Sequence, residues 1–84
     1  MTALDERQVC ALTAYAIGPT QPQAARLLGI CERSVRRYLT TATTALEATS
    51  PVHALALAAA RGLIDPDHLR LRTPPPWPHK RSRS

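Results

Sequence analysis

Apolar side chains recur at helical spacing in four segments of the chain. The first segment, DERQVCALTAYAI, begins at Asp5, whose carboxylate is expected to cap the helix that follows. Val9, Leu12 and Ala16 then fall on one face, which we expect to be buried. Gly18 is predicted to end this helix as its C′ residue.

A second, shorter helix is predicted directly afterwards, in the stretch TQPQAARLL. Thr20 and Gln23 have the spacing of a capping box, in which each residue satisfies a backbone N–H group of the other. Gly29 is expected to end the helix, and Ile30 to fill the turn that follows. The inward stripe of this helix consists of Ala24, Ala25 and Leu28.

A third helix is predicted for residues 32 to about 46. A rotation of about 100° per residue about the helix axis places its side chains on two opposite faces. The apolar face holds Val35, Tyr38, Leu39, Ala42 and Leu46. The opposite face holds Arg33, Arg36, Arg37, Thr40 and Thr44, with only the acidic Glu32 nearby. Such a face is either an ordinary solvated surface or a surface for a polyanion.

A fourth helix, residues 51–61, is predicted from the Ser50 cap and from Pro51 at its first position. It carries two apolar stripes, one of Ala54, Leu57 and Ala58 and one of Val52, Leu55 and Ala59. A small domain needs only one stripe for its core, so the stripe of Val52, Leu55 and Ala59 is a candidate dimer interface. The alternative is that these are ordinary exposed apolar side chains, which do not contact a second protein chain.

The chain changes character at residue 65, which divides it into a domain of residues 1–64 and a tail of residues 65–84. The tail holds five of the eight prolines, and we expect it to be flexible apart from one short turn from Asp65 to Leu71. Lys80, Arg81 and Arg83 are candidates for phosphate contacts. Alternatively the segment TPPPWP, around Trp77, docks in a partner protein, or the tail only promotes solubility.

Composition narrows the fold and the class of partner. The 84 residues include no Phe and are rich in Ala and Leu, which favours a single all-α domain. The net charge of +5 favours a nucleic-acid partner, although basic charge also serves solubility. No signal peptide or membrane span is evident, so we expect a cytoplasmic, nucleoid-associated protein.

Side chains that could support catalysis or bind a metal are scattered. His53, His68 and His79 have no paired spacing, and Cys10 and Cys31 form no CxxC motif. We therefore expect no metal, no cofactor and no enzymatic activity. Cys10 is expected in or near the core. Cys31 is interpreted as a small buried hydrophobic residue, with a redox-sensitive thiol as the alternative.

Residues 4–64 resemble the LuxR/GerE-type DNA-binding domain, a four-helix helix-turn-helix fold. Gly18 and Thr20 match its Gly-x-Ser, and AARLLGICERSVRRYL resembles Ile-Ala-x-x-Leu-x-Ile-Ser-x-x-Thr-Val-x-x-His-Leu. HALALAAARGLI resembles its closing Gln-Ala-x-x-x-Ala-x-x-x-Gly-Leu-Ile. Cys31 replaces a Ser before the recognition helix and is a poor cap, and Tyr38 replaces a frequent His. We expect a stand-alone domain, without the receiver or sensor domain of most members.

The resemblance implies a transcriptional regulator that binds duplex DNA sequence-specifically, with the third helix in the major groove and a homodimer formed through the fourth. The candidates for base contacts are Glu32, Arg33 and Arg36. The candidates for phosphate contacts are Thr20, Gln21, Gln23, Arg37, Thr40 and Thr44, besides the three basic tail residues. For Thr20, Gln21 and Gln23, the sequence favours a role in capping alone. The rival functions are an accessory protein of phage recombination or packaging, and a protein-interaction module such as an anti-repressor or polymerase cofactor.

Overall fold

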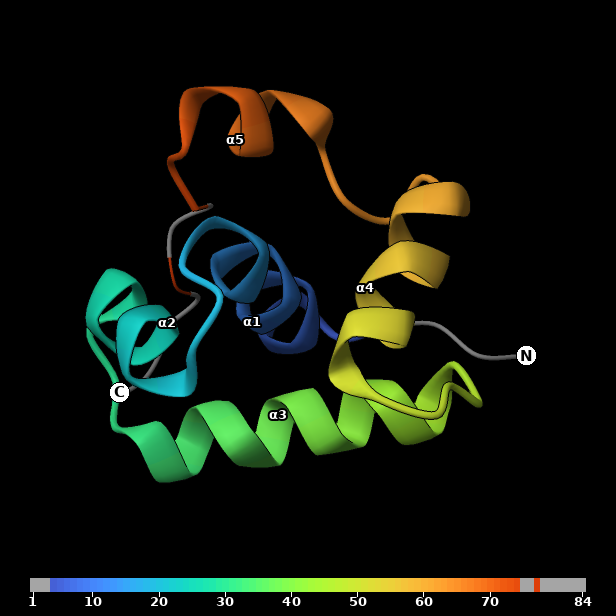
Figure 1. The fold of residues 1–84 in the computed structure, drawn as a ribbon, viewed down its shortest axis with the longest axis horizontal. Coiled ribbons are helices and arrows are strands. Elements are labelled where there is room, and N and C mark those ends of the chain that lie inside the picture. The colour runs from blue at the N-terminus through green and yellow to red at the C-terminus, as the bar shows by residue number, and fades with distance from the viewer. Residues whose placement is uncertain (1–3, 75–76, 78–84) are drawn as a thin grey trace.

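Five helices surround a buried core rich in alanine and leucine in the computed structural model, which describes residues 4–74 and residue 77. The helices are α1 (Glu6–Ile17), α2 (Gln21–Leu28), α3 (Glu32–Ala45), α4 (Pro51–Ala60) and α5 (Pro66–Leu71). Helix α1 runs through the centre and contacts the other four helices, with α3 and α5 on opposite sides of it (Figure 1). The predicted all-α fold is confirmed, with no strand among the described residues.

The predicted helix starts are found at the expected polar residues. Ser50 Oγ accepts a hydrogen bond from the His53 N–H (3.1 Å), and Thr20 Oγ1 accepts one from the Gln23 N–H (3.2 Å). The Thr20 N–H, however, donates to the Gly18 carbonyl, so the capping box predicted at α2 is only half formed. A complete capping box occurs at α1 instead, where the side chain of Asp5 caps the helix and its N–H donates to Gln8 Oε1.

Two glycines next to α2 serve different purposes. Gly29 adopts the left-handed conformation at φ +70°, as expected after a helix. Gly18 also ends its helix as predicted, but its φ is −116°, which is extended and not left-handed. A Cβ atom on Gly18 would lie 2.8 Å from Gln23 Cβ. The absence of a side chain at Gly18 therefore lets the start of α2 come close to the end of α1.

Burial on α1 is broader than the single apolar stripe predicted for it. Five consecutive residues, Cys10 to Ala14, are buried, whereas Val9 and Ala16 are only partly buried. The reason is that α1 is packed by four other helices and has little surface left for solvent. The hydroxyl of Thr13 donates to the Val9 carbonyl at 2.8 Å, which satisfies a polar group within the core.

The remaining core residues fall where the pattern placed them. On α3, Val35, Leu39 and Ala42 are buried. On α4, Ala54 and Ala58 are fully buried, and these small side chains let α4 lie close to its neighbours. Helix α3 continues through its threonine-rich end to Ala45, where the hydroxyls of Thr41 and Thr43 donate to carbonyls one turn earlier.

Packing does not stop at residue 64, where the sequence changes character. Asp65 caps α5, which contacts α1 and brings Leu69 against the core. Beyond α5, Trp77 is partly buried and packs on the same core. The short turn predicted from Asp65 to Leu71 is thus a short helix, Pro66–Leu71, which packs on the bundle. Flexibility of the tail stays a prediction.

Candidate functional site

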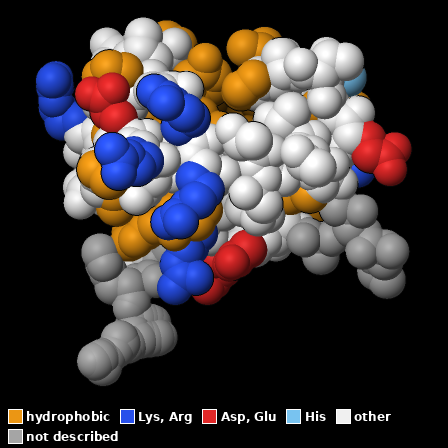
Figure 2. Space-filling model, turned by 90° about the horizontal axis from the view of Figure 1, so that it is seen from below, with side chains coloured by type: hydrophobic (Ala, Val, Ile, Leu, Met, Phe, Trp, Pro, Cys, Tyr) orange, Lys and Arg blue, Asp and Glu red, His pale blue; other side chains and the backbone are white. Residues whose placement is uncertain are grey.

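The exposed face of α3 carries three arginines along one side of a single helix. The predicted split is confirmed, since Val35, Leu39 and Ala42 are buried while the polar side is exposed, with Arg33, Arg36, Arg37, Thr40 and Thr44. Figure 2 views the molecule from this side and shows basic side chains gathered over the N-terminal half of α3. The helix is anchored through its apolar side, so these guanidinium groups project from a rigid element.

The α3 arginines have no carboxylate partner within the part of the chain that the structure describes. The ion pairs found there are Arg7 with Asp5 and Arg70 with Asp67, and neither involves α3. Glu32 is exposed in the first turn of α3, where its charge favours the helix dipole. The positive charge of Arg33, Arg36 and Arg37 is therefore not neutralised by a contact and is available to an anion.

Gln21 of α2 contacts this surface. Gln21 Oε1 accepts a long hydrogen bond, 3.4 Å, from Arg36 Nε, although the two residues are fifteen positions apart. The contact holds the guanidinium of Arg36 toward the start of α2. Among the predicted phosphate ligands, the structure thus brings Gln21 together with Arg36.

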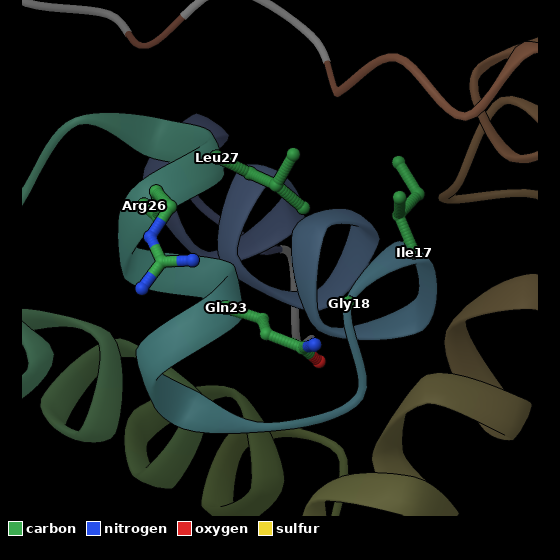
Figure 3. A pocket seen from close by; sticks show the side chains of 5 residues that line it. All are labelled: Ile17, Gly18, Gln23, Arg26 and Leu27. Atoms are coloured by element: carbon green, nitrogen blue, oxygen red, sulfur yellow. The ribbon is translucent and has the colours of Figure 1, made fainter.

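Thr20 and Gln23, the other two candidates near the start of α2, have local contacts. Thr20 caps the helix through its hydroxyl. Gln23 lines an open groove of about 250 Å³ between the end of α1 and α2, together with Ile17, Gly18, Arg26 and Leu27 (Figure 3). For Thr20, capping is thus the observed contact, as the sequence favoured.

An aromatic contact flanks the basic face and was not foreseen from the sequence. The Tyr38 and Trp77 rings lie edge to face, with centroids 5.3 Å apart and planes at 60°. The guanidinium of Arg37 lies 5.8 Å from the centroid of the same Tyr38 ring, within cation–π range. Tyr38 is partly buried and packs against the core, as expected for a residue on the apolar face of this helix. Its partner is 39 positions away, and periodicity along one helix carries no information about such a contact.

The two cysteines occupy different environments. Cys10 is buried as expected, and burial, aided by the charges of Glu6 and Asp5, raises its pKa to about 11. Cys31 is exposed at the N-cap of α3, so its interpretation as a buried hydrophobic residue is wrong. Its Sγ lies 3.3 Å from Ser34 Oγ, and this hydrogen bond lowers the pKa of the thiol. The thiol makes no side-chain capping bond, as expected for Cys.

The predicted dimer surface on α4 is only partly free. Val52 is 63% exposed and Ala59 is exposed, but Leu55 is partly buried and packs against the core. The outer stripe is therefore narrower than the sequence indicated, because the second side of α4 also faces the bundle.

Other candidate chemistry is sparse. Lys80, Arg81, Arg83 and His79 lie outside the described residues. Within residues 4–74 and 77 no three His, Cys, Asp or Glu side chains are grouped so that they could hold a metal ion. None of the described helices is long and apolar enough to cross a membrane.

Comparison with protein-family models, with curated proteins and with solved structures finds no match to this chain.

Proposed function

We propose that this chain is a transcriptional regulator that binds duplex DNA sequence-specifically, with α3 in the major groove. One observation carries the proposal: three arginines project from one side of α3 without a carboxylate partner among the described residues, while the other side is fixed in the core. Guanidinium groups attract phosphates and pair bidentately with guanine O6 and N7. A surface that served only solubility would not require them to be concentrated on one helix.

The connection between α2 and α3 supports this proposal. The two helices pack on each other and are joined by three residues, Gly29 to Cys31, with Gly29 left-handed and Ile30 against the core. A short turn that contains Gly, followed by an exposed amphipathic helix, is the arrangement of a helix-turn-helix. With its side chains, a helix is about 10–12 Å wide, which suits a major groove of about 12 Å.

The contacts are assigned by position along α3. In a helix-turn-helix, residues near the start of the recognition helix reach the base edges. Arg33 and Arg36 therefore pair with guanine, and Glu32 accepts from cytosine N4. Arg37, Thr40 and Thr44 bind phosphates, as does Gln21 beside Arg36. The resemblance of residues 4–64 to LuxR/GerE-type domains suggests a homodimer on paired half-sites, with Val52 and Ala59 at its interface.

Selection of bound sequences from random duplex DNA, at stated salt, tests the proposal. We expect an enriched motif, arranged as an inverted repeat if the chain dimerises. Arg33→Ala and Arg36→Ala should each cost about 1–3 kcal/mol of binding free energy and relax preference at one base pair. Arg37→Ala should weaken all sequences alike. Arg61→Ala, at the far end of α4, is a control that loses the same charge.

Absence of any enriched sequence, together with a tight protein partner, would replace this proposal with a protein-interaction module. An Arg33→Ala variant that keeps full affinity for DNA and the same preferred site would refute the base contact at Arg33. In that case the charge of α3 would act only through phosphates.

A further inference from the structure

We propose that Trp77 is a positioning residue for DNA binding: its ring packs on Tyr38, and the Tyr38 ring holds the guanidinium of Arg37 in place to bind a phosphate. The inference rests on the proposed function and adds to it a residue from outside the predicted domain of residues 1–64. It also gives Trp77 a binding site within its own chain, on α3.

Three side chains form a continuous row at the flank of the basic face. The Trp77 and Tyr38 rings lie edge to face, an arrangement that aromatic pairs prefer, with centroids 5.3 Å apart and planes at 60°. The Arg37 guanidinium lies 5.8 Å from the centroid of the Tyr38 ring. Because both contacts use the same ring, a change in the orientation of Tyr38 would alter the two together.

Helical geometry does not by itself bring Arg37 and Tyr38 together. Successive residues are about 100° apart around a helix axis, so neighbours in sequence do not face each other. The contact therefore depends on the direction in which the Tyr38 side chain extends, and Trp77 packs against that side chain. Tyr38 is partly buried, whereas Arg37 is exposed. The ring is thus fixed by packing and can restrain the cation beside it.

Trp77 is itself constrained by more than the contact with Tyr38. Its side chain is partly buried and packs against the core. Just past the end of α5, the Thr73 N–H donates to the His68 carbonyl at 3.0 Å. Prolines occupy positions 74–76 in the sequence, and proline reduces the conformational entropy of an unfolded chain. The entropic cost of holding Trp77 on the bundle is lowered accordingly.

A restrained guanidinium binds a phosphate more tightly than a mobile one. An arginine side chain loses much of its rotamer freedom when it binds an anion. Contact with the Tyr38 ring removes part of that freedom beforehand, so less is lost when DNA binds. Phosphates are the same in every sequence, and a contact with one carries no base preference. Trp77 should therefore raise the affinity for DNA without changing the preferred site.

The test is a double-mutant cycle on the affinity of the full chain for its preferred duplex at fixed salt. Trp77→Ala should weaken binding about two- to fivefold, the strength of an exposed cation–π contact, and should weaken unrelated duplexes by the same factor. In an Arg37→Ala background it should have almost no further effect, because the side chain that it positions is gone. In an Arg33→Ala background, the matched control on the same helix, Trp77→Ala should keep its full effect.

Conservative variants separate the aromatic contact from packing. Trp77→Phe keeps an aromatic ring against Tyr38 and should retain most of the affinity, whereas Trp77→Leu keeps only apolar bulk and should lose it. Circular dichroism and thermal denaturation establish that each variant is folded, and Trp77→Leu takes the place of Trp77→Ala if the latter does not fold. Tyr38→Phe keeps the ring and should bind DNA like the parent. A loss in Tyr38→Phe equal to that in Tyr38→Leu would mean that the hydroxyl binds the phosphate itself, which would overturn the positioning role.

A measurement without DNA separates the inference from its premise. In the free chain, the NMR order parameter of the Arg37 Nε–Hε bond should fall in Trp77→Ala, while that of Arg33 should not change. An unchanged order parameter at Arg37, or an equal effect of Trp77→Ala in the parent and Arg37→Ala backgrounds, would overturn the positioning role. Failure of the unaltered chain to bind any duplex would instead refute the proposed function, whatever the order parameters. A lowered order parameter together with coupling confined to Arg37 supports the inference.

Discussion

Gly18→Ala should destabilise the protein, although the backbone at residue 18 is suitable for any amino acid. At φ −116° an alanine is unstrained, and on backbone grounds alone the change would stabilise the fold by about 0.4–1 kcal/mol. The added methyl group, however, would meet Gln23 Cβ at 2.8 Å and Leu27 Cδ1 at 3.3 Å. Gln23 Cβ is attached to the backbone of α2, so it cannot rotate away, and the helix itself has to shift.

Overpacking of this kind costs about 1–3 kcal/mol, which exceeds the gain from the unfolded state. We expect a net loss of about 1–2 kcal/mol in the free energy of unfolding. For a domain of this size that loss lowers the melting temperature by roughly 5–15 °C. Gly29→Ala offers a contrast, because nothing lies within 4 Å of its Cβ position while φ is +70°. Its cost of about 1–2 kcal/mol would come from the backbone alone.

Thermal and urea denaturation followed by circular dichroism measures both changes. Gln23→Gly removes the clashing Cβ, so in the Gly18→Ala background it should cost less than the roughly 0.5–1 kcal/mol that a glycine inside a helix costs in the parent chain. In the Gly29→Ala background the same change should have its full cost. Gly18→Ala with stability equal to or above that of the parent would refute the argument that close approach of α2 requires glycine here.

Four further predictions concern the core, a helix cap and the thiols. Leu39→Ala, at a side chain with 1% exposure, should cost about 2–5 kcal/mol in urea denaturation, and a loss below about 1 kcal/mol would contradict its place in the core. Ser50→Ala should cost about 1 kcal/mol and Ser50→Gly only a few tenths, and unchanged stability in Ser50→Ala would mean that the Ser50 hydroxyl does not stabilise α4. Iodoacetamide should modify Cys31 first, at a rate that rises with pH through a pKa below the ordinary thiol value, while Cys10 reacts only on unfolding. Because the folded-state pKa of Cys10 is raised, the unfolded chain loses that proton first, so stability should fall as pH rises from the ordinary thiol pKa toward about 11, and Cys10→Ala should remove that fall.

Local structure in this protein is specified by the order of its amino acids. Helix starts at Asp5, Thr20 and Ser50 were predictable because a capping side chain bonds to a backbone N–H only two or three residues away. The two faces of α3 were predictable for a similar reason, since helical geometry fixes which residues share a side. Both depend on separations of a few residues, which can be read directly along the chain.

Features that depend on contacts between helices are determined by how the whole chain packs. Burial around most of α1, partial burial of Leu55 and the close approach at Gly18 follow from neighbours distant in sequence. The Trp77–Tyr38 contact and the exposure of Cys31 belong to the same class. A repeating apolar pattern identifies the side of a helix that is buried, but it does not identify what covers that side. The covering element emerges only in the folded bundle, because each helix buries its surface only against the others.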